Sequence, residues 1–334
     1  MKRFGPVIFF LLLSLLCCIP CFSSCMEWVK FRPDNAPQYG YLIAYDKSAQ
    51  KVALLSGDLE LWYFDGKSWV KDWEGIPDTD YDNLYYYGAL GIFYDDRISA
   101  LVLIAHIGSP TQMGGIELLR YTADKHWVRY GDFLAGALPP GAADQLALAY
   151  DSTHQSVVMI VDYWPDGNAT VVYDGTNYSI NLNPPDIYLS WGFAAYDPES
   201  DKVVFYGSDS FSTDNINVYE YDGRTWTQTL NQPSCQGTSE NHCAPAGLAY
   251  DPILHGIVSI TQSVESALTW LYINNLWMPI NVESNLPHWG GALMTFNYCN
   301  GYLLNYYPTL GSDFIIYNTW KLKESNHCRP INKP

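Results

Sequence analysis

One short motif recurs six times along this chain of 334 residues, and it restricts the fold more than any other feature. The copies read AYDKSAQKVALL, FYDDRISALVLI, AYDSTHQSVVMI, AYDPESDKVVFY, AYDPILHGIVSI and, in degenerate form, TFNYCNGYLLNY. In each copy an aromatic residue stands seven positions before an apolar one, as Tyr45 does before Val52 and Tyr250 before Ile257. The residues between them favour tight turns, and a β-branched run follows in most copies. The repeat therefore predicts a β-hairpin in every copy.

A second motif follows in most copies and consists of an aromatic residue, a turn, and then Trp or Tyr. It reads FDGKSW, YDGTNY, YDGRTW and YINNLW, with one extra residue in YTADKHW. Asp-Gly supplies the positive-φ turn of a second hairpin, so each unit is expected to contain four strands, here called A to D. No segment has the periodicity of an amphipathic helix.

The first motif recurs about every 50 residues, and four-stranded units at this period favour a β-propeller, whose blades bury their faces against one another. Strand A is rich in Gly and Ala, as expected of an innermost strand. We predict an all-β, six-bladed β-propeller of four-stranded antiparallel blades, forming one domain over residues 26–328. The expected blades span residues 40–73, 88–133, 145–182, 191–230, 245–281, and 290–322 together with 26–32, followed by a tail at 329–334.

The strand order, the corner at YDGRTW and the repeat length resemble kelch-type propellers, including the central domain of the galactose oxidase group. The resemblance extends over residues 26–328. Kelch repeats usually end strand B in Gly-Gly, whereas single glycines, Gly57 and Gly207, stand at those positions here. The resemblance implies the propeller fold. The copper site of the oxidases needs tyrosines, histidines and a cysteine crosslinked to tyrosine, and no matching motif is found.

The segment EWVKFRP, residues 27–33, reads as the tail of a repeat that precedes the first repeat. We therefore expect an N-terminal strand to join the last blade as its strand D and close the ring, since an open propeller would expose an edge strand. A rival strand D contains Trp320, but this residue follows Tyr317 too closely for a hairpin. Residues 313–322 are accordingly expected to form one strand C.

Residues 1–25 have the pattern of a secretion signal. Lys2 and Arg3 precede an apolar run at residues 6–19, which is shorter than a membrane span. We therefore expect a secreted or cell-surface protein. Two kinds of processing remain open, because Phe22-Ser23-Ser24-Cys25 resembles a lipobox: cleavage near Ser24, or lipidation of Cys25 as the protein's one attachment to a membrane.

Four cysteines follow the leader: Cys235, Cys243, Cys299 and Cys328. An even number in an exported protein favours disulfides. Cys235 and Cys243 close a short loop and are expected to pair with each other, which leaves Cys299 to pair with Cys328. Free buried thiols are the alternative.

The chain has a formal net charge of -17, and removal of the basic leader makes it more acidic. A protein that binds nucleic acid needs clustered Lys and Arg to contact phosphates. The composition therefore excludes nucleic acid as a general partner. We expect a monomer.

The strand order puts the A–B and C–D turns on one face, here called the turn face, and the B–C and D–A connections on the other, here called the variable face. Turns of the first kind are short, rich in Asp and alike, which suits a structural role. Connections of the second kind are long and dissimilar, and such loops on a rigid scaffold usually carry binding. Aromatic rings beside carboxylates suit a glycan or a cationic partner. The candidate ligand-binding residues are Asp78, Asp80, Asp82, Tyr86, Trp164, Asp186, Tyr188, Trp191, Phe211, His288, Trp289 and Tyr306.

Asp78, Asp80 and Asp82 alternate as the ligands of a calcium loop do. However, Asn83 occupies the expected Gly position, and the closing Glu is missing. The histidines lack the paired spacing of metal sites. We therefore expect no cofactor, with calcium at this loop as the weaker alternative.

Three functions remain open. The favoured one is an exported, non-catalytic binding module for a glycan or a protein. The second is a polysaccharide hydrolase or lyase in which loop carboxylates such as Asp144 or Asp186 act as acid and base. The third is a structural envelope protein. The sequence contains no nucleophile elbow and no P-loop, and we single out no catalytic residue.

Overall fold

The computed structural model describes residues between positions 26 and 324, with gaps. The described residues are 26–31, 33, 35–37, 40–56, 60–73, 85–108, 116–133, 146–163, 167–181, 188–208, 216–229, 233, 244–262, 267–280, 282–283, 293–310 and 315–324. Within these ranges the regular structure is entirely β. None of the described residues belongs to a helix that could cross a membrane.

Five four-stranded antiparallel sheets, here called blades 1 to 5, follow one another along the chain. Blade 1 contains β2 (Gly40–Asp46), β3 (Lys51–Ser56), β4 (Leu61–Phe64) and β5 (Trp69–Trp73). Blade 2 contains β6 (Tyr85–Asp95), β7 (Ala100–Gly108), β8 (Ile116–Tyr121) and β9 (Trp127–Phe133). Blade 3 contains β10 (Leu146–Asp151), β11 (Ser156–Tyr163), β12 (Gly167–Tyr173) and β13 (Tyr178–Asn181). Blade 4 contains β14 (Tyr188–Asp197), β15 (Lys202–Ser208), β16 (Ile216–Tyr221) and β17 (Trp226–Gln228). Blade 5 contains β18 (Ala244–Asp251), β19 (Gly256–Gln262), β20 (Ala267–Ile273) and β21 (Leu276–Ile280).

The remaining described strands form a different, five-stranded sheet. Its order is β22-β1-β25-β24-β23, where β1 is Met26–Phe31, β22 is Val282–Glu283, β23 is Leu293–Asn297, β24 is Tyr302–Leu310 and β25 is Ile315–Glu324. β1 pairs antiparallel with β25 along its whole length and in parallel with β22. The prediction of six four-stranded antiparallel blades is therefore wrong: the described residues form five, not six. The physical reason is that a strand at the edge of a sheet can accept a further strand, and the chain leaving blade 5 pairs with β1 at β22.

The pairing register confirms the hairpins that the repeat predicts. Tyr45 pairs with Val52 and Tyr250 with Ile257, and Phe296 of the degenerate copy pairs with Leu303. The second motif behaves in the same way, since Phe64 pairs with Trp69. A fixed spacing across a tight turn thus sets which residues face each other.

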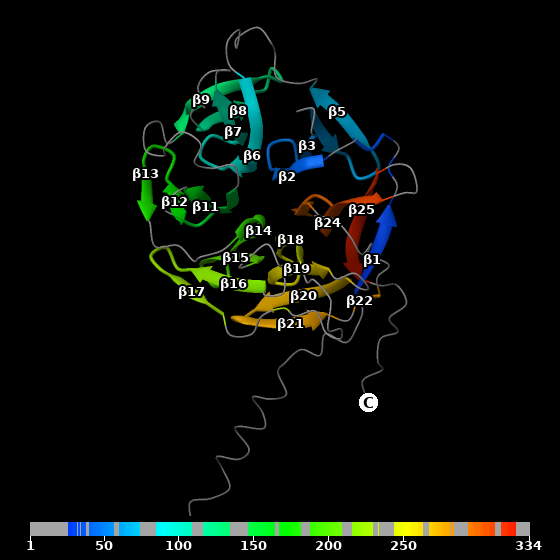
Figure 1. The fold of residues 1–334 in the computed structure, drawn as a ribbon. Coiled ribbons are helices and arrows are strands. Elements are labelled where there is room, and N and C mark those ends of the chain that lie inside the picture. Colours follow the sequence, from blue (N-terminus) through cyan, green and yellow to red (C-terminus); the bar gives the residue numbers. More distant parts are fainter. Residues whose placement is uncertain are drawn as a thin grey trace, which may run out of the picture.

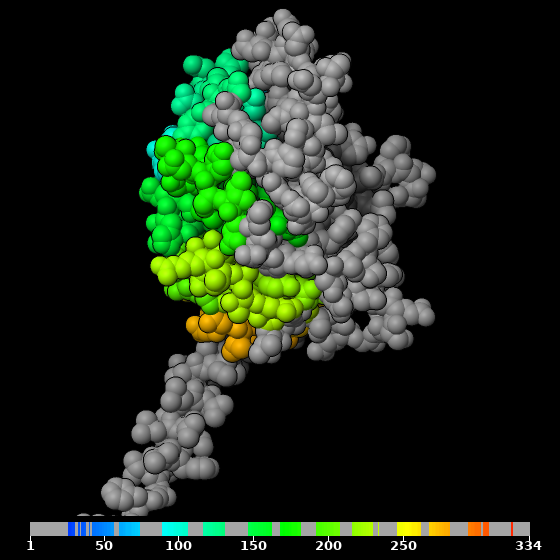
Figure 2. Space-filling model, turned by 60° about the vertical axis from the view of Figure 1, so that its left-hand side comes forward, coloured from blue at the N-terminus to red at the C-terminus, as the bar shows by residue number. Residues whose placement is uncertain are grey.

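Figure 1 shows the sheets arranged around a common centre, with β5, β9, β13, β17 and β21 at the rim. The first strands of neighbouring sheets lie side by side, and β23 lies beside both β18 and β2. The fold is therefore that of a β-propeller. Figure 2 shows blade 3 in green resting against blade 4 in yellow-green.

The hydrophobic core lies between the sheets. Leu54 of blade 1 packs with Leu304 of the five-stranded sheet, and Leu101 of blade 2 packs with Leu55 of blade 1. All four side chains have at most 1% of their surface exposed. Because each sheet buries apolar faces against its neighbours, the repeats depend on one another for stability.

The Asp of each Tyr-Asp copy shapes the turn that follows it. Asp46 Oδ1 accepts hydrogen bonds from the backbone N–H groups of Ser48 and Ala49, at 2.8 and 3.0 Å, and Asp251 makes the same bonds with Ile253 and Leu254. These carboxylates are buried. They accept hydrogen bonds from backbone N–H groups of the turn and so take the place of a backbone carbonyl. The Asp of the sequence repeat is thus a turn former.

Candidate functional site

Most of the residues predicted to bind a ligand lie outside the described residues, namely Asp78, Asp80, Asp82, Trp164, Asp186, Phe211, His288 and Trp289. The backbone of three others is described: Tyr86 lies on β6, and Tyr188 and Trp191 lie on β14. The structure does not describe the side chains of these three residues. The proposed use of the variable face therefore stays a prediction.

Tyr306 lies in the hydrophobic core. Its side chain is 1% exposed, its ring packs edge-on against Trp69 with centroids 5.6 Å apart, and its hydroxyl donates to the carbonyl of Pro37. This residue joins the five-stranded sheet to blade 1 and is not available to a ligand on the surface.

The structure shows Cys299 as a free, exposed thiol in the turn after β23. It does not show the predicted disulfide with Cys328, which lies outside the described residues, as do Cys235, Cys243 and Cys25. The Cys235–Cys243 bond and lipidation of Cys25 stay predictions.

A pocket of about 270 Å³ lies on the propeller axis at the turn face. Residues of the A–B turns, among them Ser152 and Pro198, stand at its mouth. The first strands of all the sheets supply its deeper wall with small and apolar side chains, such as Ala149 and Leu248. The rim carries a set of tyrosines, here called the tyrosine ring: Tyr45, Tyr94, Tyr150, Tyr196, Tyr250 and Tyr298.

The tyrosine hydroxyls link neighbouring sheets. Tyr150 of blade 3 accepts from the backbone N–H of Asp96 in the turn of blade 2, at 3.2 Å. Tyr250 of blade 5 donates to Glu199 Oε1 in the turn of blade 4, at 3.3 Å. The Tyr of Tyr-Asp thus contacts the turn of the preceding blade while its ring borders the axial pocket. Desolvation raises the pKa of Tyr150 to about 12, so this hydroxyl stays protonated at neutral pH.

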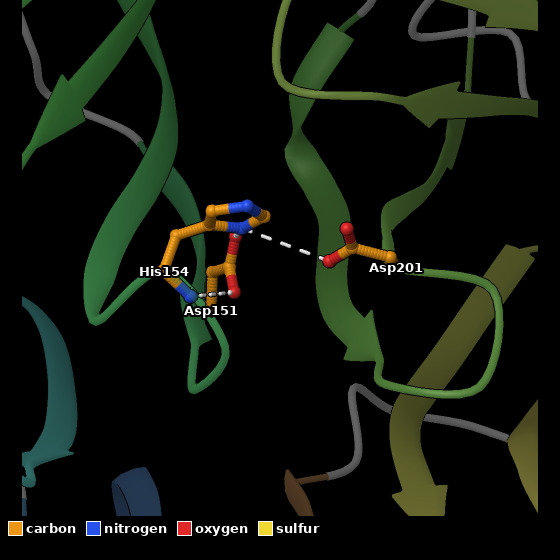
Figure 3. A group of neighbouring side chains, drawn as sticks. All are labelled: Asp151, His154 and Asp201. Carbon is orange, nitrogen blue, oxygen red and sulfur yellow. Dashed lines mark hydrogen bonds and ion pairs between the residues drawn. The ribbon is translucent and has the colours of Figure 1, made fainter.

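A second group of polar side chains lies on the same face between blades 3 and 4. Asp151 is the last residue of β10, His154 lies in the turn that follows it, and Asp201 lies in the turn after β14 (Figure 3). His154 Nδ1 lies 2.8 Å from Asp151 Oδ2 and 3.6 Å from Asp201 Oδ1. The hydrogen bond with Asp151 raises the pKa of His154.

This group borders a cleft of about 390 Å³ between the two blades. Arg224 and Asp222, from the turn after β16, also line the cleft. The cleft therefore combines a mixed Asp-His-Asp set with one cationic side chain.

Sequence reasoning assigned the turn face a structural role and so missed both features. A signal was present for each. The Tyr of Tyr-Asp recurs in five of the copies, and a ring of blades brings such a residue to the axis once per blade. His154 stands three residues after Asp151, which puts both groups in one tight turn.

No protein-family model matches the chain, and no curated protein matches its sequence. Solved structures do match its fold. AofleA from Arthrobotrys oligospora, solved as a triple mutant, is 12% identical, with a TM-score of 0.57 over 91% of this chain and 92% of that one. An auxiliary nutrient binding protein from Bacteroides thetaiotaomicron is 8% identical, with a TM-score of 0.55 over 90% of this chain and 77% of that one. At these identities the likeness extends to the fold alone.

Proposed function

We propose that the protein is an exported, non-catalytic binding propeller whose ligand is a carbohydrate, and that the axial pocket of the turn face takes one sugar unit. The observation that carries this proposal is the tyrosine ring around the pocket. A sugar offers CH groups that stack on aromatic rings and hydroxyls that exchange hydrogen bonds with Tyr and Ser. The nutrient-binding relative has a binding role on the same fold.

The dimensions of the pocket favour a small or terminal unit. Its volume of about 270 Å³ lies near the lower end of the range for ligand pockets, about 300 Å³. The wall is built from rigid β-strands, so little conformational entropy is lost on binding. Tyr298 is 51% exposed, which leaves its ring open to a ligand.

Other parts of the proposal rest on the sequence. We predict that the propeller is of the kelch type and that the protein is a monomer. We also predict that it is exported, with or without a lipid on Cys25. A second contact surface on the aromatic and acidic loops that the sequence assigns to the variable face also belongs to the proposal as a prediction.

The test is a glycan array followed by titration calorimetry on the best ligand. Ser152→Trp places an indole at the mouth of the pocket, because Ser152 is exposed there and its side chain makes no hydrogen bond to another described residue. We expect affinity to fall by at least about tenfold, the loss that corresponds to 1.4 kcal/mol.

Ser179→Trp is the matched control, since Ser179 is exposed on the outer strand β13, away from the axis. It should leave affinity unchanged. Equal affinity in both variants would show that the ligand does not bind in the axial pocket. Release of reducing sugar from the same polysaccharides by the wild-type protein would instead establish the hydrolase alternative and refute the non-catalytic function.

A further inference from the structure

We propose that Asp151, His154 and Asp201 bind a divalent transition-metal ion of the Zn²⁺ class, which joins blade 3 to blade 4 at the turn face. The set combines an imidazole nitrogen with two carboxylate oxygens, and both kinds of atom are ligands that Zn²⁺ accepts in proteins. The inference is independent of the carbohydrate proposal, because the cleft and the axial pocket are lined by different residues.

The three ligand atoms already converge. One atom from each side chain lies within 4.8 Å of the other two. Tetrahedral coordination with bonds of about 2.0–2.2 Å places ligand atoms roughly 3.3–3.6 Å apart. His154 Nδ1 lies 2.8 Å from one carboxylate oxygen and 3.6 Å from the other, so small movements reach this geometry. Asp201 can supply them, because its side chain is 53% exposed.

Groups outside the set hold the ligands in position. Asp151 Oδ1 accepts from the backbone N–H of Thr153 and His154, at 3.0 and 2.9 Å, which leaves Oδ2 for the metal. The Tyr196 hydroxyl donates to Asp201 Oδ1 at 2.7 Å. Such outer bonds orient ligands and reduce the cost of ordering them.

The repeat itself provides an independent comparison. The position of His154, three residues after the turn-forming Asp or Asn, is occupied in the other copies by Ala49, Ile98, Ser200, Leu254 and Asn300. The position of Asp201, four residues after, holds Gln50, Ser99, Gln155, His255 and Gly301. Only the junction of blades 3 and 4 therefore brings a histidine from one turn to a carboxylate of the next at these positions. The other copies form the same turn without this combination, so the turn itself does not require His154 and Asp201.

The site also has an entry path and an open coordination position. It borders the cleft between blades 3 and 4, and the side chain of His154 is 60% exposed. Three protein ligands leave a fourth position for water.

The junction of blades 4 and 5 offers a matched control. There His255 Nδ1 lies 3.0 Å from Glu199 Oε1, also between two exposed turn residues. Among the described residues no second carboxylate completes that pair into a set of three. A histidine–carboxylate pair alone is thus present at one junction and the full set at the other.

The experiment measures Zn²⁺ binding to the EDTA-treated protein by titration calorimetry and by the shift in Tm. All variants carry Cys299→Ser, because the exposed thiol is itself a Zn²⁺ ligand. We expect one ion per chain and a higher Tm with the metal. His154→Gln and Asp201→Asn should each weaken binding by at least about 100-fold, since loss of an outer partner alone costs up to that factor.

His255→Gln should leave affinity and Tm shift unchanged. The visible spectrum of the Co²⁺ form adds a readout that depends on the ligands, because replacing His154 changes the coordination set. Failure of Zn²⁺ to bind, or equal loss in the His154 and His255 variants, would overturn the proposal. Carbohydrate binding measured on the same variants separates this result from the function proposed for the axial pocket.

Discussion

At the scale of single residues, the aspartates of the two hairpin motifs have pKa values shifted in opposite directions. Asp222 follows a strand on the outer part of blade 4 and is exposed, and hydrogen bonds from the backbone of Thr225 and Arg224 lower its pKa. Asp251 makes similar bonds but is buried, and desolvation, the largest effect, raises its pKa. Burial of the ionised Asp251 carboxylate therefore lowers the free energy of unfolding at neutral pH.

Asp251→Asn should keep the turn and remove that cost. The amide oxygen can accept the same backbone bonds, as Asn297 does at the equivalent position from Asn300. Because the folded pKa is raised, the carboxyl group favours folding below the unfolded pKa of 3.8, and this contribution is lost as pH rises through the folded value. The variant should thus be at least as stable as wild type at pH 7 in urea unfolding.

The advantage of Asp251→Asn should disappear as pH falls below 3.8, where the carboxyl group is protonated in both the folded and the unfolded state. Asp46→Asn is the control, because Asp46 also accepts a 2.6 Å bond from the Tyr63 hydroxyl within the core. It should destabilise at pH 7 by roughly 1–3 kcal/mol. An equal loss in both variants at pH 7 would contradict this account of burial.

At the scale of strands and turns, Gly in the Asp-Gly corner is required by backbone conformation. Gly175 and Gly223 have φ of +96° and +87°, which residues with a Cβ rarely adopt. Their surroundings differ. A Cβ at Gly223 would meet no atom within 4 Å, whereas one at Gly175 would overlap the Arg97 guanidinium. The two positions therefore separate backbone strain from side-chain crowding.

Gly223→Ala should lower the free energy of unfolding by about 1–2 kcal/mol through strain alone. Gly175→Ala should cost more, because Arg97 must also leave its bonds to Asp95. Urea unfolding of both variants measures the difference. If Gly223→Ala matched wild type, or if the two variants lost the same amount, the account of one or both positions would be wrong.

At the scale of the whole molecule, the N-terminal strand joins segments from opposite ends of the chain. β1 pairs with β25 from Met26 opposite Glu324 to Phe31 opposite Thr319. Trp28 of β1 is 5% exposed, packs in the core shared with blade 5, and donates through Nε1 to Thr269 Oγ1 at 2.9 Å. β1 thus contacts both β25 and blade 5.

Trp28→Ala should destabilise the protein by about 3–5 kcal/mol, as expected for the loss of a large buried aromatic side chain. Thr269→Val is the milder control, because it removes one hydrogen bond and keeps the packing, at a cost of roughly 1–3 kcal/mol. Thermal and urea unfolding compare the two. A small effect of Trp28→Ala would show that the propeller does not depend on β1, and would contradict closure of the ring by the N-terminal strand.

The sequence by itself determined the hairpins and their register. Tyr45 opposite Val52 and Phe64 opposite Trp69 follow from spacing across tight turns, which is a local property of the chain. It also determined the all-β propeller, because a four-stranded unit that recurs must bury its faces against its own copies. Pairing of the N-terminal segment could be expected from its likeness to strand D.

Only the tertiary structure decided how the sheets meet. It placed Val282–Glu283 beside β1 and so produced a five-stranded sheet, put Tyr306 in the core, and brought Asp201 to His154 across two blades. It also turned the recurring tyrosine into the rim of an axial pocket on the face expected to be only structural. These features depend on the distance and rotation between neighbouring sheets, which side-chain packing sets and which residue spacing along one chain does not encode.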